Sequence, residues 1–297
     1  MNPRKFKQVD VFTKLPFRGN PVAVVLECEG FDTAAMQRIA AWTNLSETAF
    51  VLPPTSPAAD YRLRIFTPRA ELPFAGHPTI GSAHAVIEAE IVKPKNGRLT
   101  QECGAGNLEL MVEGDTLWLD APAWTSTAIT DAEVSAMEKA LGARAVGKPC
   151  ILNVGPGWLI AEMESAESVA ALTPDMQSIA ELSTKRSIGG VTVYGSSRDG
   201  RSAIHVRSFA PAHGIAEDPV CGSGNISVAA YLAQSGQGAR FGDRYIARQG
   251  MQLGRDGQVS IRYAGGKIFL GGSAVTCIDG TLRAGGSIGL RYGDGPP

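Results

Sequence analysis

Two short glycine-bearing segments contain residues that could bind a small acid. Residues 74–78 read FAGHP and residues 219–224 read PVCGSG, and each precedes a stretch of apolar and small residues that predicts a buried helix. The first N–H groups of a helix lack partners within it and carry partial positive charge, so they attract anions. If these turns do more than begin a helix, two of them facing one cleft would bind a carboxylate. Their candidate binding residues are Gly76, Cys221, Gly222 and Ser223.

Three side chains could move or hold a proton, namely Glu47, His77 and Asp218. Glu47 follows a predicted helix and has no cationic neighbour in the sequence. An exposed glutamate is a weak base, but burial beside a second carboxylate such as Asp218 would make Glu47 useful near neutral pH. The alternatives are structural: His77 could cap a helix or fill the core, Asp218 could be a turn residue, and Ser223 could be an N-cap.

The cysteines and histidines do not form a metal or disulfide pattern. The five cysteines are odd in number and widely spaced, without a CxxC pair, and the four histidines include no HExxH spacing. We therefore expect no metal site. Four cysteines are expected to be small buried side chains; these are Cys28, Cys103, Cys150 and Cys277.

Charge and composition exclude several classes of protein. The 297 residues include 28 Lys and Arg against 29 Asp and Glu, which gives a net charge of −1 and no basic surface for nucleic acid. No apolar stretch of about 18 residues suggests a membrane span. The N-terminus has charges but no apolar signal core after them, so we expect a cytoplasmic protein.

The two halves of the chain resemble each other at a nearly constant offset. Three segments recur 140 to 146 residues later, in the same order: MQRIA at 36–40 as MQSIA at 176–180, RIFTP at 64–68 as RSFAP at 207–211, and AGHP at 75–78 as CGSG at 221–224. The hairpin around Gly114 likewise matches the segment around Gly257. Four ordered matches indicate an internal duplication.

Each half predicts strands surrounding one central helix. The two central helices are expected at residues 78–91 and 223–234, where small and apolar residues leave no broad polar face. A peripheral helix is expected in each half, capped by Asp32 in the first and by Thr173 in the second. The expected strands are 22–26, 49–52 and 61–66 in the first half, and 158–161, 191–194 and 203–209 in the second.

These elements predict an α+β fold of two pseudo-symmetric lobes, each a curved, mostly antiparallel sheet or barrel around a central helix. We expect the first lobe at residues 1–122 and the second at 123–272. Residues 273–297 form a C-terminal strand and tail that crosses back to the first lobe. A cleft between two lobes is a common place for a ligand site.

Several of these segments resemble the phenazine-biosynthesis isomerases, the PhzF-like family of the diaminopimelate-epimerase fold. The resemblance runs from about residue 6 to about 282. It implies cofactor-free isomerisation of a small carboxylate by proton transfer, with Glu47 moving the proton. It also implies that Gly76, His77, Asp218 and Ser223 hold or polarise the substrate and that Asn20 faces it. The matching segments are FRGNP at 17–21, SETAF at 46–50, FTPRAELPFAGHPT at 66–79 and EDPVCGSG at 217–224.

Cys221 is where this chain departs from the phenazine enzymes that it resembles, most of which have Thr at the matching position. Diaminopimelate epimerase and proline racemase, relatives of the fold, have a catalytic Cys at this position and a second one in the other lobe, where this chain has Ala75. A two-thiol racemase is therefore disfavoured. A thiol at a helix N-terminus is expected to have a lowered pKa, so a one-thiol epimerase using Cys221 with Glu47 remains an alternative to an inert Cys221.

Two further functions compete with the isomerase. Residues 222–227 approximate the GxGxxG of nucleotide-binding proteins, but the polar, proline-bearing residues 212–220 before them do not predict the strand that this motif needs. A catalytically silent binding or scaffold protein of the same fold would be the other alternative. The expected partner is a small carboxylate, with no nucleic acid and no membrane, and a homodimer is the common prior.

Overall fold

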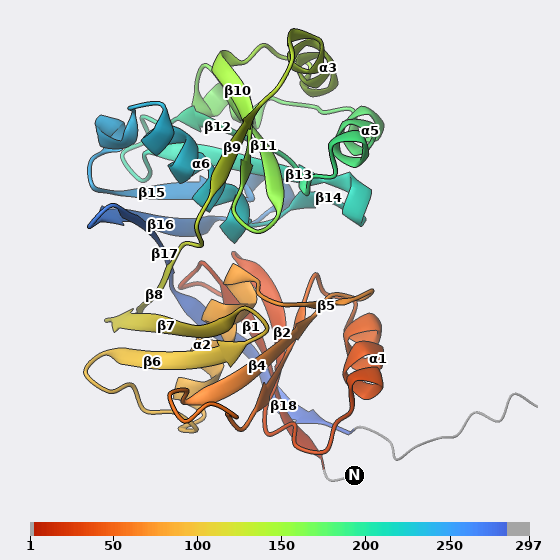
Figure 1. Ribbon diagram of the computed structural model, residues 1–297, viewed down its shortest axis with the longest axis vertical. Coiled ribbons are helices and arrows are strands. Elements are labelled where there is room, and N and C mark those ends of the chain that lie inside the picture. The colour runs from red at the N-terminus through yellow and green to blue at the C-terminus, as the bar shows by residue number, and fades with distance from the viewer. Residues whose placement is uncertain (1–2, 284–297) are drawn as a thin grey trace, which may run out of the picture.

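A computed structural model describes residues 3–283, apart from the side chain of residue 239. Two lobes stack along the long axis of the molecule (Figure 1). The first contains β1 (Arg4–Val11), β2 (Asn20–Val25), α1 (Thr33–Thr43), β3 (Thr48–Leu52), β4 (Tyr61–Phe66), β5 (Glu71–Leu72), α2 (Gly76–Glu88), β6 (Arg98–Cys103), β7 (Gly106–Glu113) and β8 (Thr116–Asp120). Within the described residues, no helix is both long and apolar enough to cross a membrane.

The second lobe repeats this order of elements from β10 onward, with β9, α3 and α4 as additions. It contains β9 (Thr125–Ala128), α3 (Asp131–Leu141), β10 (Val146–Asn153), β11 (Gly157–Glu162), α4 (Ala166–Ala170), α5 (Met176–Arg186), β12 (Gly190–Ser196), β13 (Ile204–Ala210), β14 (Ile215–Asp218), α6 (Gly222–Gln234), β15 (Arg244–Gln249), β16 (Gly257–Ala264) and β17 (Lys267–Gly272). The last strand, β18 (Ala274–Leu282), returns to the first lobe and pairs with β1. Three short 3₁₀ turns occupy Pro211–His213, Gly238–Phe241 and Met251–Leu253.

Strand pairing repeats between the lobes. In the first lobe β1 and β2 are antiparallel, β2 and β3 parallel, β3 and β4 antiparallel, and β4 and β6 parallel. In the second lobe β10 to β13 and β15 repeat this series of directions. The junction between the lobes is formed by the β7–β8 hairpin of the first lobe and the β16–β17 hairpin of the second. Strand β8 pairs with β17, which joins all described strands into one sheet. The structure thus has the two-lobe α+β fold expected from the duplication.

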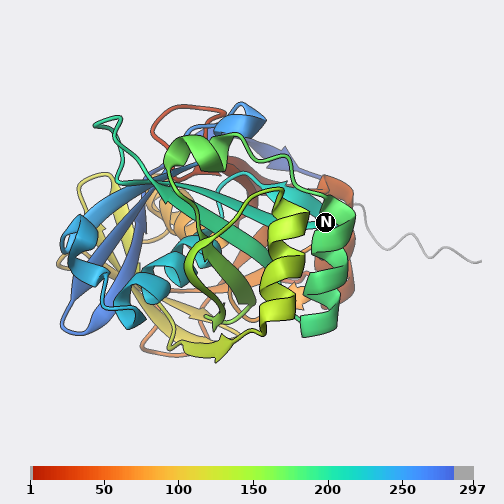
Figure 2. The same ribbon diagram turned by 90° about the horizontal axis from the view of Figure 1, so that it is seen from above.

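Each lobe wraps its sheet around one buried helix, α2 or α6, while α1, α3 and α5 lie outside (Figures 1 and 2). Nine of the 13 residues of α2 and ten of the 13 of α6 are buried. Small residues and alternating Ile and Val allow this close enclosure. Both central helices belong to a single apolar core that crosses the junction of the lobes. Their ends are therefore held rigidly relative to each other.

Helix starts differ from the sequence predictions in two ways. The second peripheral helix, α5, is capped by Asp175 rather than Thr173, because the Asp175 carboxylate accepts hydrogen bonds from the N–H groups of Gln177 and Ser178. Both central helices begin earlier than expected, at Gly76 and Gly222. The glycine segments are thus the first helical turns themselves. Asp32 caps α1 as predicted.

Two strands at the C-terminal end pair with the first lobe, β17 with β8 and β18 with β1. Residues 284–297 of the expected tail lie outside the described residues. We propose the link between β8 and β9, which runs from one lobe to the other, as the boundary between residues 1–122 and 123–272.

Candidate active site

The N-termini of the two central helices meet at the junction of the lobes. An ideal Cβ placed on Gly222 would lie 3.8 Å from the backbone nitrogen of His77, so the first turns of α2 and α6 are neighbours. The Leu270 side chain of β17 lies beside both turns, 3.4 Å from such a Cβ on Gly76 and 3.3 Å from one on Gly222. The two glycines leave the backbone N–H groups of both helices accessible to a small ligand.

These helix starts have N–H groups without protein acceptors. Ala75, the N-cap of α2, makes no side-chain cap, and Cys221 caps only the N–H of Gly224 in α6. Within residues 3–283, no acceptor bonds the N–H groups at the four positions 76, 77, 222 and 223. Four convergent donors and two helix dipoles therefore create a positive site without a Lys or Arg side chain.

Glu47 and His77 face each other beside these N–H groups. Asn44 ends α1 in a left-handed backbone conformation and turns the chain toward β3, which places Glu47 just before that strand. Oε2 of Glu47 lies 3.4 Å from Nε2 of His77, and both atoms are buried without a hydrogen-bond partner among the described residues. Two reactive atoms thus point at each other with capacity left for a ligand.

Burial lowers the pKa of His77, although the charges of Glu47 and Asp10 and a hydrogen bond with the Pro21 backbone act to raise it. The imidazole is therefore neutral at physiological pH. A neutral His77 keeps one protonated and one unprotonated ring nitrogen, so it can donate or accept a hydrogen bond but adds no full charge.

Asp218 approaches from the second lobe. Its Oδ1 accepts hydrogen bonds from Nδ2 of Asn20 at 3.0 Å and from the N–H of Val220 at 3.0 Å. Burial and then the negative charge of Glu47 raise the pKa of Asp218 to about 7. The Glu47 charge is therefore close enough to act on Asp218, and the second carboxyl holds a proton over much of the neutral range.

Asn20 and Ser223 are both present at this site, each with a protein partner. Asn20 also donates to the carbonyl of Val220, so its amide joins β2 to the segment before α6. Oγ of Ser223 accepts from the indole N–H of Trp158 at 3.0 Å. Asn20 therefore bonds Asp218 directly, which the sequence could not indicate.

Cys221 differs from its expectation. The sequence predicts a lowered pKa for a thiol at a helix N-terminus, but burial, followed by the charge of Asp218, raises the pKa of Cys221 well above its ordinary value. Its sulfur accepts a hydrogen bond from the N–H of Gly224, and only 4% of the residue is exposed. Desolvation outweighs the helix dipole here, so the thiol stays protonated and serves as a helix cap.

Two residues that the sequence did not single out support the site. Gln249 is fully buried; its Nε2 donates to the carbonyl of Asp218, and its Oε1 accepts from the N–H of Cys221. Asp10 is 2% exposed and lies near His77. Neither has a local sequence signal, because the hydrogen-bond partners of each lie at least eight positions away in the chain.

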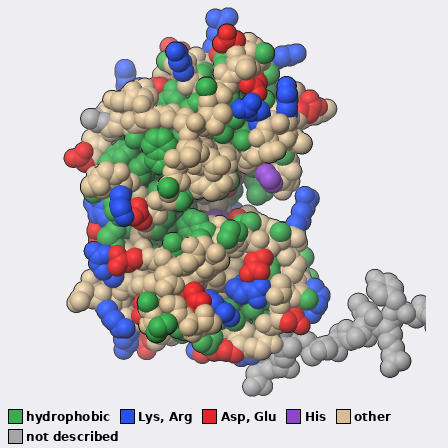
Figure 3. Space-filling model, viewed as in Figure 1, with side chains coloured by type: hydrophobic (Ala, Val, Ile, Leu, Met, Phe, Trp, Pro, Cys, Tyr) green, Lys and Arg blue, Asp and Glu red, His purple; other side chains and the backbone are tan. Residues whose placement is uncertain are grey.

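The space-filling view shows a groove between the lobes (Figure 3), and the N-termini of α2 and α6 lie at this junction. Gly76, Asp218 and Ser223 are only partly buried, and the Glu47 side chain is 16% exposed. A separate cavity of about 730 Å³ lies in the second lobe between β9, the β10–β11 turn and the end of α5, and none of the candidate residues lines it. The groove between the lobes therefore gives access to the candidate residues.

This arrangement can perform acid–base chemistry on a bound carboxylate. Glu47 lies beside a neutral imidazole, Asp218 has a raised pKa and lies near Glu47, and four N–H groups without protein acceptors lie beside Glu47 and His77. Such a pair of unlike carboxyl groups separates a base from an acid.

Comparison with known proteins identifies the family and agrees with the fold. A family model described as phenazine biosynthesis-like protein, PhzC-PhzF, matches residues 9–280. A protein of Schizosaccharomyces pombe called antisense-enhancing sequence 1 is 41% identical over 295 residues, which cover 94% of this chain and 99% of that protein. The trans-2,3-dihydro-3-hydroxyanthranilate isomerase of Pseudomonas fluorescens is 35% identical over 286 residues, which cover 92% of this chain and 97% of that enzyme.

A solved structure shows the same fold. The PhzF-family phenazine biosynthesis protein of Bacillus anthracis matches with a TM-score of 0.84 and 24% identity, covering 96% of this chain and all of that one.

Proposed function

Since the chain belongs to the PhzC-PhzF, phenazine biosynthesis-like family of isomerases, we propose that it moves a proton within a small carboxylate by means of Glu47. The observation that carries this proposal is that two helix N-termini, each with N–H groups that lack protein acceptors, meet beside Glu47, His77 and Asp218. The protein is an isomerase by family; the substrate class and the roles of its residues are our proposal.

The four free N–H groups of α2 and α6 would bind the substrate carboxylate. Glycine at positions 76 and 222 allows the close approach. Each helix dipole contributes about 0.3–1 kcal/mol when exposed and up to about 2 kcal/mol when partly buried. The hydrogen bonds supply the rest. The donors are fixed in direction, so a bound carboxylate presents the adjoining carbon atoms to Glu47 in one orientation.

Glu47 would remove a proton from a carbon next to a conjugated or carbonyl system. The C–H electron pair moves into that system as the Glu47 oxygen takes the proton. The proton on Glu47 exchanges with solvent through the partly exposed side chain, and Glu47 then protonates another carbon of the same molecule, which completes an isomerisation without a change in composition. Asp218 would donate a hydrogen bond, or its proton, to the developing negative charge, and His77 would hold or relay a proton beside Glu47.

The alternative function is a one-thiol epimerase that uses Cys221. The surroundings of Cys221 argue against it. A buried, protonated thiol that caps a helix is a poor base. We expect Cys221→Ala to keep turnover within about threefold of wild type, because Gly222 and its N–H group are unchanged. Loss of the sulfur cap should lower the free energy of unfolding by about 1 kcal/mol. A loss of turnover of about 100-fold in a folded variant would favour the epimerase.

Exchange of substrate hydrogen with solvent tests the proposed function. The wild-type protein is incubated in D₂O with trans-2,3-dihydro-3-hydroxyanthranilate, the compound in the name of the Pseudomonas fluorescens relative, and with other small carboxylates whose C–H adjoins a conjugated group. We call this set the probe carboxylates. Mass spectrometry should find one deuterium per product molecule. A protein that binds these compounds but leaves all of their C–H bonds unlabelled would not be the proposed isomerase.

A further inference from the structure

We propose that Asp10 is the positioning residue that the two lobes share: its carboxylate fixes the turn before Asn20 and Pro21, and these hold Asp218 and His77. This inference rests on the proposed function, because it concerns the placement of the groups assigned there. Asp10 touches no substrate in this account and acts only through its neighbours.

The Asp10 carboxylate clamps a backbone turn. Its Oδ2 accepts hydrogen bonds from the N–H groups of Arg18 at 2.8 Å and Gly19 at 2.9 Å. Its Oδ1 is buried, and no described residue donates a hydrogen bond to it. Charge-assisted bonds of this kind are about twice as strong as neutral ones. One oxygen of Asp10 therefore holds the turn, while the other is buried without a hydrogen bond from the described residues.

The clamped segment, residues 12–19, has little freedom to move. A Cβ on Gly19 would lie 2.0 Å from the carbonyl oxygen of Val11, so only glycine fits there. Phe12 and Phe17 have φ values of 66° and 67°, a left-handed conformation that is unfavourable for a bulky side chain. Such a backbone persists only where its surroundings enforce it, and Asp10 provides part of that enforcement.

Two residues directly after this segment reach the proposed catalytic groups. Asn20 donates to Oδ1 of Asp218 in the second lobe. Pro21 lies opposite Asp10 in the β1–β2 register, and its backbone hydrogen-bonds with His77. The negative charge of Asp10 also acts on His77 directly. A shift of the turn would thus displace His77 and Asp218 together.

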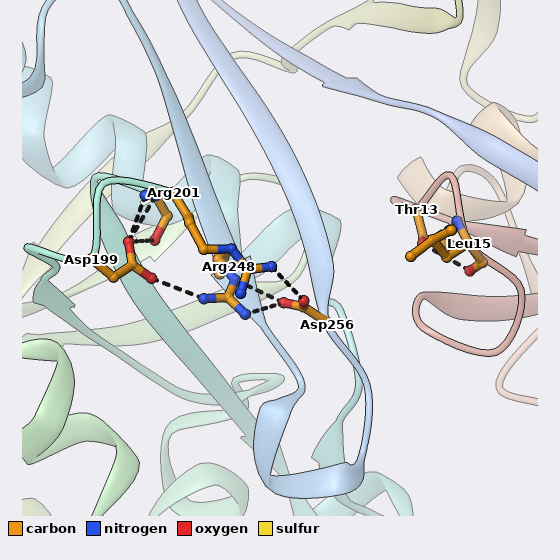
Figure 4. A network of polar contacts seen from close by, with 7 residues as sticks. Thr13, Leu15, Asp199, Arg201, Arg248 and Asp256 are labelled. Atoms are coloured by element: carbon orange, nitrogen blue, oxygen red, sulfur yellow. Dashed lines mark hydrogen bonds and ion pairs between the residues drawn. The ribbon is translucent and has the colours of Figure 1, made fainter.

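The same segment is bound to the second lobe on its far side. The N–H groups of Gln258 and Asp256 donate to the carbonyls of Phe12 and Arg18, each at 2.7 Å. Asp256 is in turn fixed by Arg248 and Arg201, whose contacts are drawn opposite Thr13 and Leu15 of the segment in Figure 4. The segment therefore spans both lobes, and Asp10 anchors its first-lobe end.

Three variants separate this positioning role from a general effect on folding. Asp10→Asn keeps an oxygen for the two N–H groups but removes the charge, whereas Asp10→Ala removes both. Arg18→Ala is the matched control, because the contacts of the turn use the backbone N–H and carbonyl of Arg18, which the substitution keeps. Circular dichroism and thermal melting identify the variants that are folded. Asp10→Asn decides the question if Asp10→Ala does not fold.

The first readout is the titration of the His77 ring by NMR, with ¹⁵N-labelled protein and His77→Gln for assignment. The charged groups near the ring are Glu47 and Asp10. Since a negative charge favours the imidazolium, Asp10→Asn should move the titration to lower pH, and Arg18→Ala should leave it unchanged. The second readout is deuterium uptake by the probe carboxylates. We expect a loss of about 100-fold in kcat for Asp10→Ala, about 10-fold for Asp10→Asn, and little change in KM.

The outcomes for Asp10 and for the proposed function differ. Suppose that folded Asp10→Asn leaves the pH at which His77 titrates unchanged and keeps the rate of deuterium uptake within twofold of wild type. Asp10 is then not a positioning residue, and the role of Glu47 is unaffected. If the wild-type protein labels none of the probe carboxylates, the proposed function fails, whereas the His77 titration still supports or overturns the placement by Asp10.

Discussion

Replacement of Glu47 by Gln should reduce turnover and deuterium exchange by 10²–10⁴-fold, the usual contribution of a positioned acid–base group. The amide keeps the size of the carboxylate but cannot take a proton from carbon. Because the buried Oε2 of Glu47 has no hydrogen-bond partner among the described residues, the substitution breaks no hydrogen bond of that oxygen. Binding of the carboxylate should also persist, since it depends on the N–H groups of α2 and α6. Steady-state kinetics and calorimetry measure the two effects separately.

Glu90→Gln is the matched control for this substitution. Glu90 follows α2 in the same lobe and its side chain is exposed, so the variant should behave as wild type in both measurements. Full activity of Glu47→Gln would remove the glutamate from the reaction. A loss of binding without a loss of kcat would instead assign Glu47 to substrate recognition.

Replacement of Asp218 by Asn should lower turnover by about 100-fold and yet raise stability at alkaline pH. The activity falls because the amide cannot supply a proton to the developing charge. The side-chain oxygen can still accept from Asn20 and Val220, so the local structure should be retained. A variant that gains stability but loses activity is expected when a carboxyl group is kept, because of its function, in surroundings that disfavour its charged form.

The pH dependence of this gain follows from the pKa of about 7 for Asp218 in the folded protein, against an ordinary value of 3.8. The raised pKa means that the folded state favours the protonated form. The stabilisation by that proton is complete below about pH 4 and is lost as the pH rises to about 7. Asp218→Asn should therefore equal wild type in unfolding free energy near pH 4. It should exceed wild type at pH 8 by up to about 4 kcal/mol, since about three pKa units separate the two values and each corresponds to about 1.4 kcal/mol.

Urea denaturation at several pH values measures this difference, with Asp243→Asn as the control. Asp243 is exposed, so its substitution should leave the pH profile of stability unchanged. If Asp218→Asn and wild type keep a constant difference from pH 4 to pH 8, Asp218 does not titrate with a raised pKa, and its proposed role as a proton donor is wrong.

The architecture could be predicted from the sequence because short similar segments recur in the two halves at a nearly constant offset. The match of residues 64–68 with 207–211 corresponds in the structure to β4 and β13, which occupy equivalent positions in the two lobes. The buried helices α2 and α6 could be predicted because a helix without a polar face must be enclosed on all sides. Their first turns were misplaced by one or two residues, since glycine does not distinguish a preceding turn from a helix start.

Properties that depend on contacts between distant residues could not be predicted. The pKa of Cys221 depends on burial by both lobes, which outweighs the helix dipole that the sequence suggested. Asp10 looks like any polar residue near the end of a strand until its contact with Arg18 and Gly19 is seen. The bond from Asn20 to Asp218 joins residues 198 positions apart, a pairing that only the folded chain creates.

The crystal structure of Glu47→Gln with a bound probe carboxylate tests the central claim most directly. We predict that the carboxylate oxygens lie within hydrogen-bond distance of the N–H groups at positions 76, 77, 222 and 223, with the exchangeable C–H directed at the amide that replaces the Glu47 carboxylate. A ligand bound away from both helix N-termini, or one with that C–H facing away from position 47, would contradict the account.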